Sequence, residues 1–266
     1  MAVERSIYMK LYIHYLSIHL RSMMEYKVSF LLTIIGQFLV SFNVFLGVYF
    51  MLQRFHQIEG FSYSEVLLCF AIVLMSFTLA ECFFRGFDTF ASMIGNGEFD
   101  RIPVRPRGAI FQVLASKIEL TRIGRLLQAI VMLIYGISNI HLHWTFLRVL
   151  TLILMILGGV ATFAGLFILY AGLCFFTLEG LEFMNIFTDG AREYGKYPVA
   201  VYGKTVLTIC TYIVPFALFQ YYPFLYLTRQ NIPAYYSFLP LLTILFLIPC
   251  FFVWNLGMRK YKSTGS

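Results

Sequence analysis

The sequence has 266 residues, of which 60% are hydrophobic, 18% aromatic and only 12% charged. Soluble globular domains carry about 25% charged residues, so this chain has too little polar surface for a soluble globule. Composition therefore predicts an all-α polytopic membrane protein. The net charge of +7 does not indicate nucleic-acid binding, because Lys and Arg are dispersed between apolar runs in the way that membrane topology requires.

Residues 1–27 lack an uninterrupted apolar core, so they indicate neither a span nor a signal peptide. Polar side chains recur at helical spacing along one face of this segment: Lys10, His14, Ser17, Arg21 and Glu25. This pattern is typical of an amphipathic helix that lies in the membrane interface. An amphipathic helix packed on protein is the alternative interpretation.

Apolar segments further along the chain are predicted to span the membrane, for which about 20 residues are needed. They are 28–52, 63–84, 123–140, 149–176, 205–220 and 238–257, within a six-span transmembrane domain over 28–257. The fourth contains small residues that let helices approach closely in lipid, among them Gly158, Gly159 and Gly165. A short tail, 258–266, follows the last span.

Two long polar segments separate these spans, at 85–125 and 177–204. With six spans, both termini and both polar segments lie on one side, which then holds 17 of the 20 Lys and Arg residues. The other side has only Arg54, Arg148 and Arg229. This positive-inside bias predicts that both termini and both polar segments are cytoplasmic. The chain has no Asn-x-Ser/Thr sequon, in keeping with a bacterial cytoplasmic membrane.

One stretch resembles the start of a phosphate-binding P-loop: Gly190, four residues, Gly195 and Lys196. A P-loop needs Ser or Thr next, to hold magnesium, and a helix whose N-terminus faces the phosphate. Here Tyr197 and Pro198 follow, and proline obstructs that helix. The chain is therefore predicted to bind no nucleotide and not to be an enzyme.

Ionisable side chains are nearly absent from the predicted spans. The nearest case is Glu81, which lies one turn before Arg85 and is expected to pair with it. Ion-coupled carriers usually place ionisable residues at mid-membrane, so energy for any transport is expected to come through a cytoplasmic surface. The five cysteines lie in apolar runs without metal-ligand spacing, and no metal or cofactor is predicted.

The segment 85–125 is punctuated by helix breakers. Gly95 and Gly97 end one helix, Pro103 and Pro106 hold an extended turn, and an apolar helical pattern resumes after residue 108. A short charged helix-turn-helix beneath a membrane bundle suits docking into a partner. A solvated connector held to lipid headgroups by arginine fits the composition equally well.

Two runs resemble a known family. The run GEFDRIPVRPRGAIFQVLASKIELTRIGRLLQ resembles the cytoplasmic segment of ABC-2-type permeases, the membrane subunits of ATP-binding-cassette (ABC) exporters. The run YGKYPVAVYGKTVLTICTYIVPFALFQYYPFLYL is similar to the Tyr-Pro segment of the same family. Both runs particularly resemble the group of this family that consists of stand-alone transmembrane subunits of about 260 residues.

The resemblance implies an N-terminal elbow helix, a cytoplasmic coupling helix in 85–125, and re-entrant extracellular helices in 215–240. It implies that the coupling region that contacts the ATPase includes Gly97, Glu98, Phe99, Asp100, Arg101, Pro103, Arg105 and Pro106. It also implies an extracellular gate formed by Pro215, Phe216, Tyr221, Tyr222 and Pro223.

Such a permease would pair with a second identical or similar permease and with two ABC ATPase subunits, which would bind ATP and Mg²⁺. The aromatic spans favour an amphipathic or lipophilic cargo: a drug, an antimicrobial peptide or a lipid-linked molecule. Two alternatives stay open, an ATPase-independent carrier or channel and a non-transporting membrane immunity or sensor subunit.

Overall fold

The computed structural model describes residues 2–55, 60–140, 144–177 and 181–261, and within these ranges it is helical with no β-strand, which confirms the all-α class. The α-helices in these ranges are α1 (Ala2–Glu25), α2 (Lys27–Phe55), α3 (Tyr63–Asp88), α4 (Phe90–Gly95), α5 (Ala109–Ser116), α6 (Ile123–Asn139), α7 (Phe146–Thr177), α8 (Asp189–Tyr194), α9 (Lys204–Tyr212), α10 (Phe216–Phe219), α11 (Tyr222–Thr228) and α12 (Thr243–Lys260). The 3₁₀ helices are η1 (Glu98–Arg101), η2 (Leu120–Arg122), η3 (Glu182–Ile186), η4 (Val199–Tyr202) and η5 (Ala234–Leu242).

In the described part of the chain, five helical segments are long and apolar enough to cross a membrane, and they match the predicted first, second, third, fourth and sixth spans. The prediction of a fifth span at 205–220 as one helix is wrong. There α9 and the α10–α11 segment meet at a bend of 88°. Pro215 stands at this bend, where it lacks an N–H and disfavours a helical residue before it. Only if α9 and the α10–α11 segment together form one bent span does the described chain have six candidate spans.

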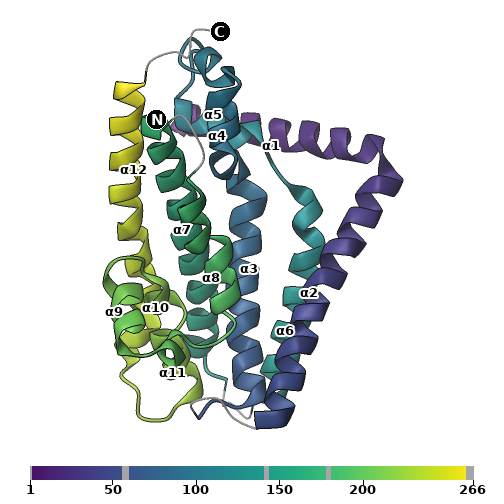
Figure 1. The fold of residues 1–266 in the computed structure, drawn as a ribbon, viewed down its shortest axis with the longest axis vertical. Coiled ribbons are helices and arrows are strands. Elements are labelled where there is room, and N and C mark those ends of the chain that lie inside the picture. The colour runs from purple at the N-terminus through teal and green to yellow at the C-terminus, as the bar shows by residue number, and fades with distance from the viewer. Residues whose placement is uncertain (1, 56–59, 141–143, 178–180, 262–266) are drawn as a thin grey trace.

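Helix α3 lies at the centre of the bundle, with α6 on one side and α7 on the other (Figure 1). Every side chain from Val66 to Leu74 is buried, because this run has no polar face to turn toward water or headgroups. A capping box starts the helix: the Glu65 N–H donates to Ser62 Oγ, and the Ser62 N–H donates to Glu65 Oε2 at 2.7 Å.

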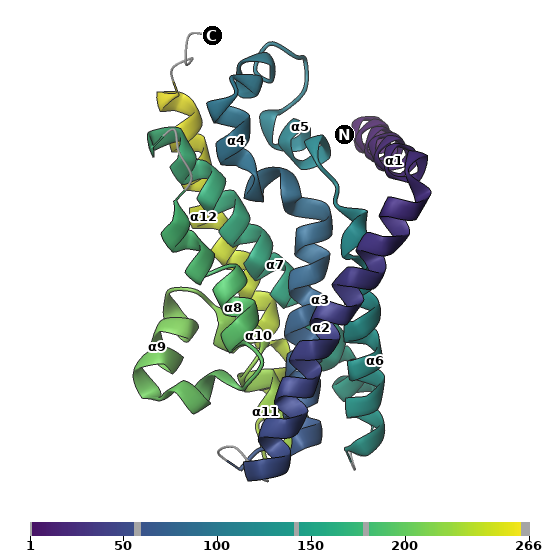
Figure 2. The same ribbon diagram turned by 45° about the vertical axis from the view of Figure 1, so that its right-hand side comes forward.

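Helix α2 is held to the bundle mainly by α6, and it stands apart from α7 and α12 (Figures 1 and 2). The backbones approach closely at Gly124, where an added Cβ would lie 2.1 Å from the Ile34 carbonyl oxygen. Among the described side chains of α2, only Ser41 and Val48 are buried. The helix therefore leaves a long apolar side uncovered.

A row of glycines on α7 lets α3, η5 and α12 pack against it. An added Cβ would lie 2.9 Å from Pro240 at Gly158, 2.4 Å from the Ser76 hydroxyl at Gly159, and 2.9 Å from the Phe246 ring at Gly165. Contacts under 3.0 Å are not tolerated by real side chains, so glycine is the residue that fits at each of these positions.

The second polar segment contains a helix at an unexpected depth. Helix α8 lies beside the middle of α3 (Figure 1), where an added Cβ at Gly195 would lie 2.7 Å from Val73. The Arg192 guanidinium is 5.3 Å from the centre of the Phe77 ring. That residues 177–204 are cytoplasmic stays a prediction. Part of this segment lies alongside α3, the most completely buried candidate span among the described residues.

The glycine packing on α7 gives a test of the fold. We expect Gly159→Ala to destabilise the protein by about 1–3 kcal/mol, because the new methyl group clashes with Ser76 in a filled core. Gly36→Ala on α2 is the matched control, since nothing lies within 4 Å of its added Cβ and alanine favours helix by about 1 kcal/mol. Thermal unfolding of the two variants in detergent measures the difference. Equal melting temperatures would contradict this packing.

Candidate functional site

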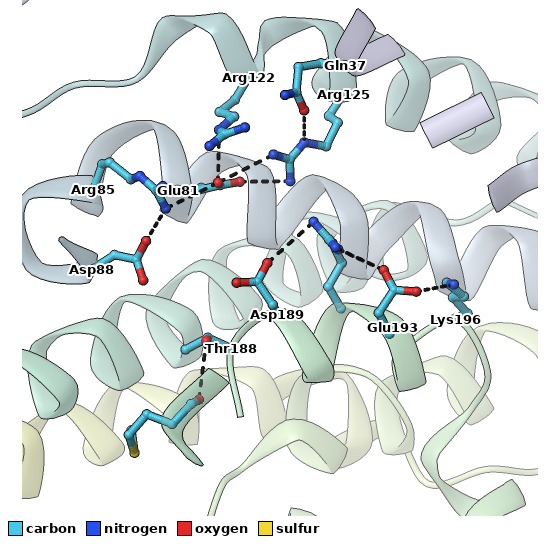
Figure 3. A network of polar contacts seen from close by, with 12 residues as sticks. Gln37, Glu81, Arg85, Asp88, Arg122, Arg125, Thr188, Asp189, Glu193 and Lys196 are labelled. Atoms are coloured by element: carbon cyan, nitrogen blue, oxygen red, sulfur yellow. Dashed lines mark hydrogen bonds and ion pairs between the residues drawn. The ribbon is translucent and has the colours of Figure 1, made fainter. Parts of the chain in front are cut away.

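A buried carboxylate at the end of α3 nearest the chain termini is shared by three arginines (Figure 3). The Glu81 oxygens lie 2.9 Å from Arg122 Nε, 2.9 Å from Arg125 Nη1 and 3.5 Å from Arg85 Nη1. Arg85 also pairs with Asp88. The predicted Glu81–Arg85 pair is therefore present, and the start of α6 supplies two further partners.

The ion cluster extends across three helices. Arg125 Nε donates to Gln37 Oε1 on α2 at 2.8 Å. The Glu81 and Arg125 side chains are only 4% and 7% exposed, so neither charge is solvated by bulk water. A buried charge is tolerated only when it is paired, and the contacts of Glu81 thus fix the position of α6 and, through Gln37, of α2 relative to α3.

A second set of charges lies on α8 and just after it, close to the first set (Figure 3). Arg192 contacts the Glu193 carboxylate at 3.0 Å and the Asp189 carboxylate at 3.6 Å, and Lys196 pairs with Glu193. Sequence analysis did not single out this set, although the i, i+3, i+4, i+7 spacing of its charges was a signal of a helical face.

The predicted coupling segment forms a compact turn at the same end of the molecule as both termini (Figure 1). Gly97 joins α4 to η1 with φ +68°, a left-handed conformation that glycine adopts at no cost. Gln112 on α5 then donates to the backbone carbonyls of Ile102 at 3.0 Å and Arg107 at 2.7 Å. These bonds hold the Pro103–Pro106 turn against α5.

Phe99 anchors this turn in the bundle and is fully buried, whereas the resemblance placed it in the contact region. Its ring packs edge-on against Phe90 and Phe175 at 5.3 and 5.0 Å, and against Tyr261 at 5.1 Å. The Tyr261 hydroxyl donates to Asp100 Oδ1 at 2.8 Å. The turn is thereby bound to α7 and to the end of α12.

The polar side chains of the turn remain accessible. Glu98 and Arg101 are exposed, as are the residues from Pro103 to Arg107. Hollows of about 710 and 330 Å³ lie on two sides of the turn, and Glu98, Arg101 and Arg105 line both. The structure therefore brings together the predicted coupling residues, with Glu98, Arg101 and Arg105 outward, Phe99 inward and Asp100 bonded to Tyr261.

Helix α1 lies across the bundle at this end and packs on α5 (Figure 2). The Tyr8 ring is 5.1 Å from Phe111, and the His19 ring nitrogen is within 3.1 Å of the Ala115 carbonyl oxygen. Burial raises the pKa of the Tyr12 phenol on the same face. An apolar stripe and a polar stripe stay exposed beside this face: Met9, Ile13, Leu20 and Met24, and Lys10, His14, Arg21 and Glu25.

The predicted gate residues lie at the opposite end, around α10 and α11 (Figure 1). Phe216 is buried in the core, and Pro223 occupies the first turn of α11. The Tyr221 and Tyr222 rings are 5.4 Å apart, and the Tyr222 hydroxyl shares a hydrogen bond with Thr211 at 3.2 Å. The structure brings the gate residues together but sets them far from the coupling turn.

Within the described residues, no three His, Cys, Asp or Glu side chains gather in a way that could hold a metal ion. The residues of the P-loop lookalike lie on and after α8, which begins at Asp189 and ends at Tyr194.

The model of one family, ABC-2 family transporter protein, matches residues 38–265 of the 266-residue chain. The chain belongs to the ABC-2 transporter family. This confirms the resemblance, and with the apolar helices it identifies a multi-pass membrane protein. No curated protein and no solved structure was found to match the chain. Membership of the ABC-2 family implies association with an ABC ATPase.

The ion cluster of this ABC-2 protein gives a stability prediction. We expect Glu81→Gln to cost about 3–5 kcal/mol, because it leaves three arginines near a buried site without their shared carboxylate. Glu98→Gln removes an exposed carboxylate at the same end and is expected to change stability by less than about 0.5 kcal/mol. Thermal unfolding of purified variants distinguishes the two, and a stable Glu81→Gln protein would contradict the role of the cluster.

The aromatic anchor gives a second prediction. Phe99→Ala is expected to destabilise the protein by about 3–5 kcal/mol, since it empties a fully buried ring position. The control is Val104→Ala in the same turn, where the side chain is 84% exposed and little burial is lost. Limited proteolysis by trypsin after Arg101 and Arg107 should accelerate in the first variant alone. Similar cleavage rates in both would show that Phe99 does not hold the turn.

Proposed function

We propose that this ABC-2 protein is the permease subunit of an ATP-driven exporter, and that an ABC ATPase docks on the turn from Gly97 to Pro106. The observation that carries the proposal is the construction of this turn. Its charged side chains are exposed, while Phe99 and Asp100 tie it to α7 and to Tyr261. A solvated connector has no need of such an anchor, so the anchor favours docking over the alternative.

In this proposal the chain is not itself an enzyme and binds no cofactor. Two ABC ATPase subunits bind ATP and Mg²⁺, and their dimerisation moves the coupling turns of two permeases, identical or similar. A force on the turn reaches α7 and α12 through the aromatic contacts and α3 and α6 through Glu81. Close-packed groups transmit such displacements because they have few alternative arrangements.

Helix α1 would act as the elbow helix at the cytoplasmic face of a bacterial cytoplasmic membrane. Its exposed apolar and polar stripes lie next to each other, which is the pattern of a helix at a lipid–water interface. Its contacts with α5 would hold the coupling segment near the membrane surface. Both termini would then be cytoplasmic, in agreement with the positive-inside bias.

The broken segment from α9 to α11 would form the re-entrant, extracellular gate, with Pro215, Phe216, Tyr221, Tyr222 and Pro223 at its centre. Its 88° bend and the tyrosine contacts support this assignment. The cargo would be amphipathic or lipophilic and would move outward between the two permeases.

The docking surface is tested by reversing its exposed charges. We expect the double variant Glu98→Arg/Arg101→Glu to weaken association with the ABC ATPase at least tenfold, because like charges across an interface cost several kcal/mol. Co-purification in detergent and cargo-stimulated ATP hydrolysis are the measurements. The unmodified Asp100 keeps its bond to Tyr261, so the turn itself is preserved.

The matched control is Glu25→Arg/Lys27→Glu, which reverses two exposed charges at the junction of α1 and α2 and keeps the net charge. Unchanged association in the first variant would remove the turn as the docking surface. Cargo flux through liposomes that contain this chain alone would favour the ATPase-independent carrier instead.

A further inference from the structure

A polar cavity lies between α2, α3, α6 and α8. Its volume is about 120 Å³, which is large enough for an oxyanion group with bound water. Its polar lining comes from three different elements: Gln37, Ser41, Arg125, Arg192 and Glu193. Its apolar lining comes from α2 and α3: Val40, Val44, Phe70 and Leu74.

The position of this cavity is unusual for charged groups. Phe70 and Leu74 belong to the fully buried stretch of α3, which is the most completely buried candidate span among the described residues. Gln37 and Ser41 are spaced by one turn on α2, so both point to the same side of an otherwise apolar helix. Ionisable groups at such depth are costly and are kept where they bind something.

Arginines from two ion-paired sets line the cavity. One set joins Arg85, Arg122 and Arg125 to Glu81 and Asp88, and the other joins Arg192 and Lys196 to Asp189 and Glu193. Arg125 has five N–H groups, and its side-chain partners, Gln37 and Glu81, cannot use all of them at the recorded distances. The cavity is thus lined by two guanidinium groups, Arg125 and Arg192, and by one carboxylate, Glu193.

We infer that this cavity binds the anionic group, a phosphate or carboxylate, of an amphipathic molecule whose apolar part lies along α2 and α3. A guanidinium pair binds such oxyanions with charge-assisted, bidentate hydrogen bonds. Val40, Val44 and Leu74 provide the apolar surface next to the arginines. The open side of α2 lets the molecule enter from lipid without crossing the bundle.

This inference deepens the proposed function. The bound molecule is identified as the cargo only if the chain is the permease proposed above. The anionic headgroup then narrows the cargo class from amphipathic molecules in general to negatively charged ones. Binding itself does not depend on the ATPase, so the two proposals can fail separately.

The test is equilibrium binding of three probes to the purified full-length chain in lipid nanodiscs. Oleoyl lysophosphatidate carries a phosphate and a tail, monoolein carries a similar tail without charge, and inorganic phosphate carries the charge alone. We expect saturable binding of the lysophosphatidate at least tenfold tighter than of monoolein. Tight binding of inorganic phosphate, with no gain from the tail, would assign the cavity to a free anion and overturn the amphipathic part of the inference.

Variants locate the site. Arg192→Gln should weaken lysophosphatidate binding at least tenfold, Arg192→Lys should restore part of it, and Ser41→Leu should block it by filling the cavity. Arg229→Gln is the matched control. Like Arg192, Arg229 pairs with a carboxylate (Glu65, at 3.1 Å) and stacks on an aromatic ring (Phe61, at 4.9 Å), but it lies outside the cavity.

Equal lysophosphatidate binding by the native chain, Arg192→Gln and Ser41→Leu would overturn the inference. If Arg192→Gln folds poorly, Ser41→Leu still tests the site. Loss of binding in Arg192→Gln with normal ATPase association supports both proposals. The Glu98→Arg/Arg101→Glu variant tests the two proposals separately. If it binds lysophosphatidate normally and also associates normally with the ATPase, the cavity site stands and the docking surface is refuted.

Discussion

The structure depends on the pairing of one buried carboxylate. Glu81 is 3% exposed and is contacted by Arg85 from its own helix and by Arg122 and Arg125 from the start of α6. Burial raises the cost of any unpaired charge in this group, so the three arginines cannot separate from the carboxylate independently. The pairing also closes the polar segment into a loop, because Arg85 begins it and Arg122 and Arg125 lie at its end.

A loop closed at one carboxylate transmits force differently from a free connector. Its middle is fixed a second time, by Phe99 against Phe175 and Tyr261. The coupling turn is consequently connected to α3 and α6 at its base and to α7 and α12 at its centre. A partner that moves the turn therefore acts on four of the candidate spans, whereas α2 is packed mainly on α6 and is reached through contacts such as Gln37 and the close approach at Gly124.

Sequence patterns predicted what depends on local composition. Hydropathy located five of the six predicted spans, and the helix breakers located the turn between α4 and α5, because apolar runs, Gly and Pro act over a few residues. The partners of Glu81 were only partly predicted: Arg85 lies four residues away, but Arg122 and Arg125 are brought near by tertiary packing. The inward position of Phe99 depends in the same way on Phe175, Trp254 and Tyr261, which are distant in the chain.

The bend between α9 and α10 was not predicted, because hydropathy registers an apolar run and not the direction of its backbone. The depth of α8 was not predicted either, because Arg192 belongs to a polar segment, yet its guanidinium lies over the Phe77 ring in the structure. Intrahelical pairing lowers the cost of placing these charges next to an apolar helix. The i, i+3, i+4, i+7 spacing of these charges indicates a paired helical face, but not the depth at which that helix lies.

The contact between Tyr261 and Asp100 also bears on biosynthesis. The ribosome makes the coupling turn long before α12, so Phe99 has neither Trp254 nor Tyr261 to pack against until the last helix has been inserted. The turn reaches its final form only in a chain whose bundle is complete. A partially inserted chain would therefore present this turn in an unformed state.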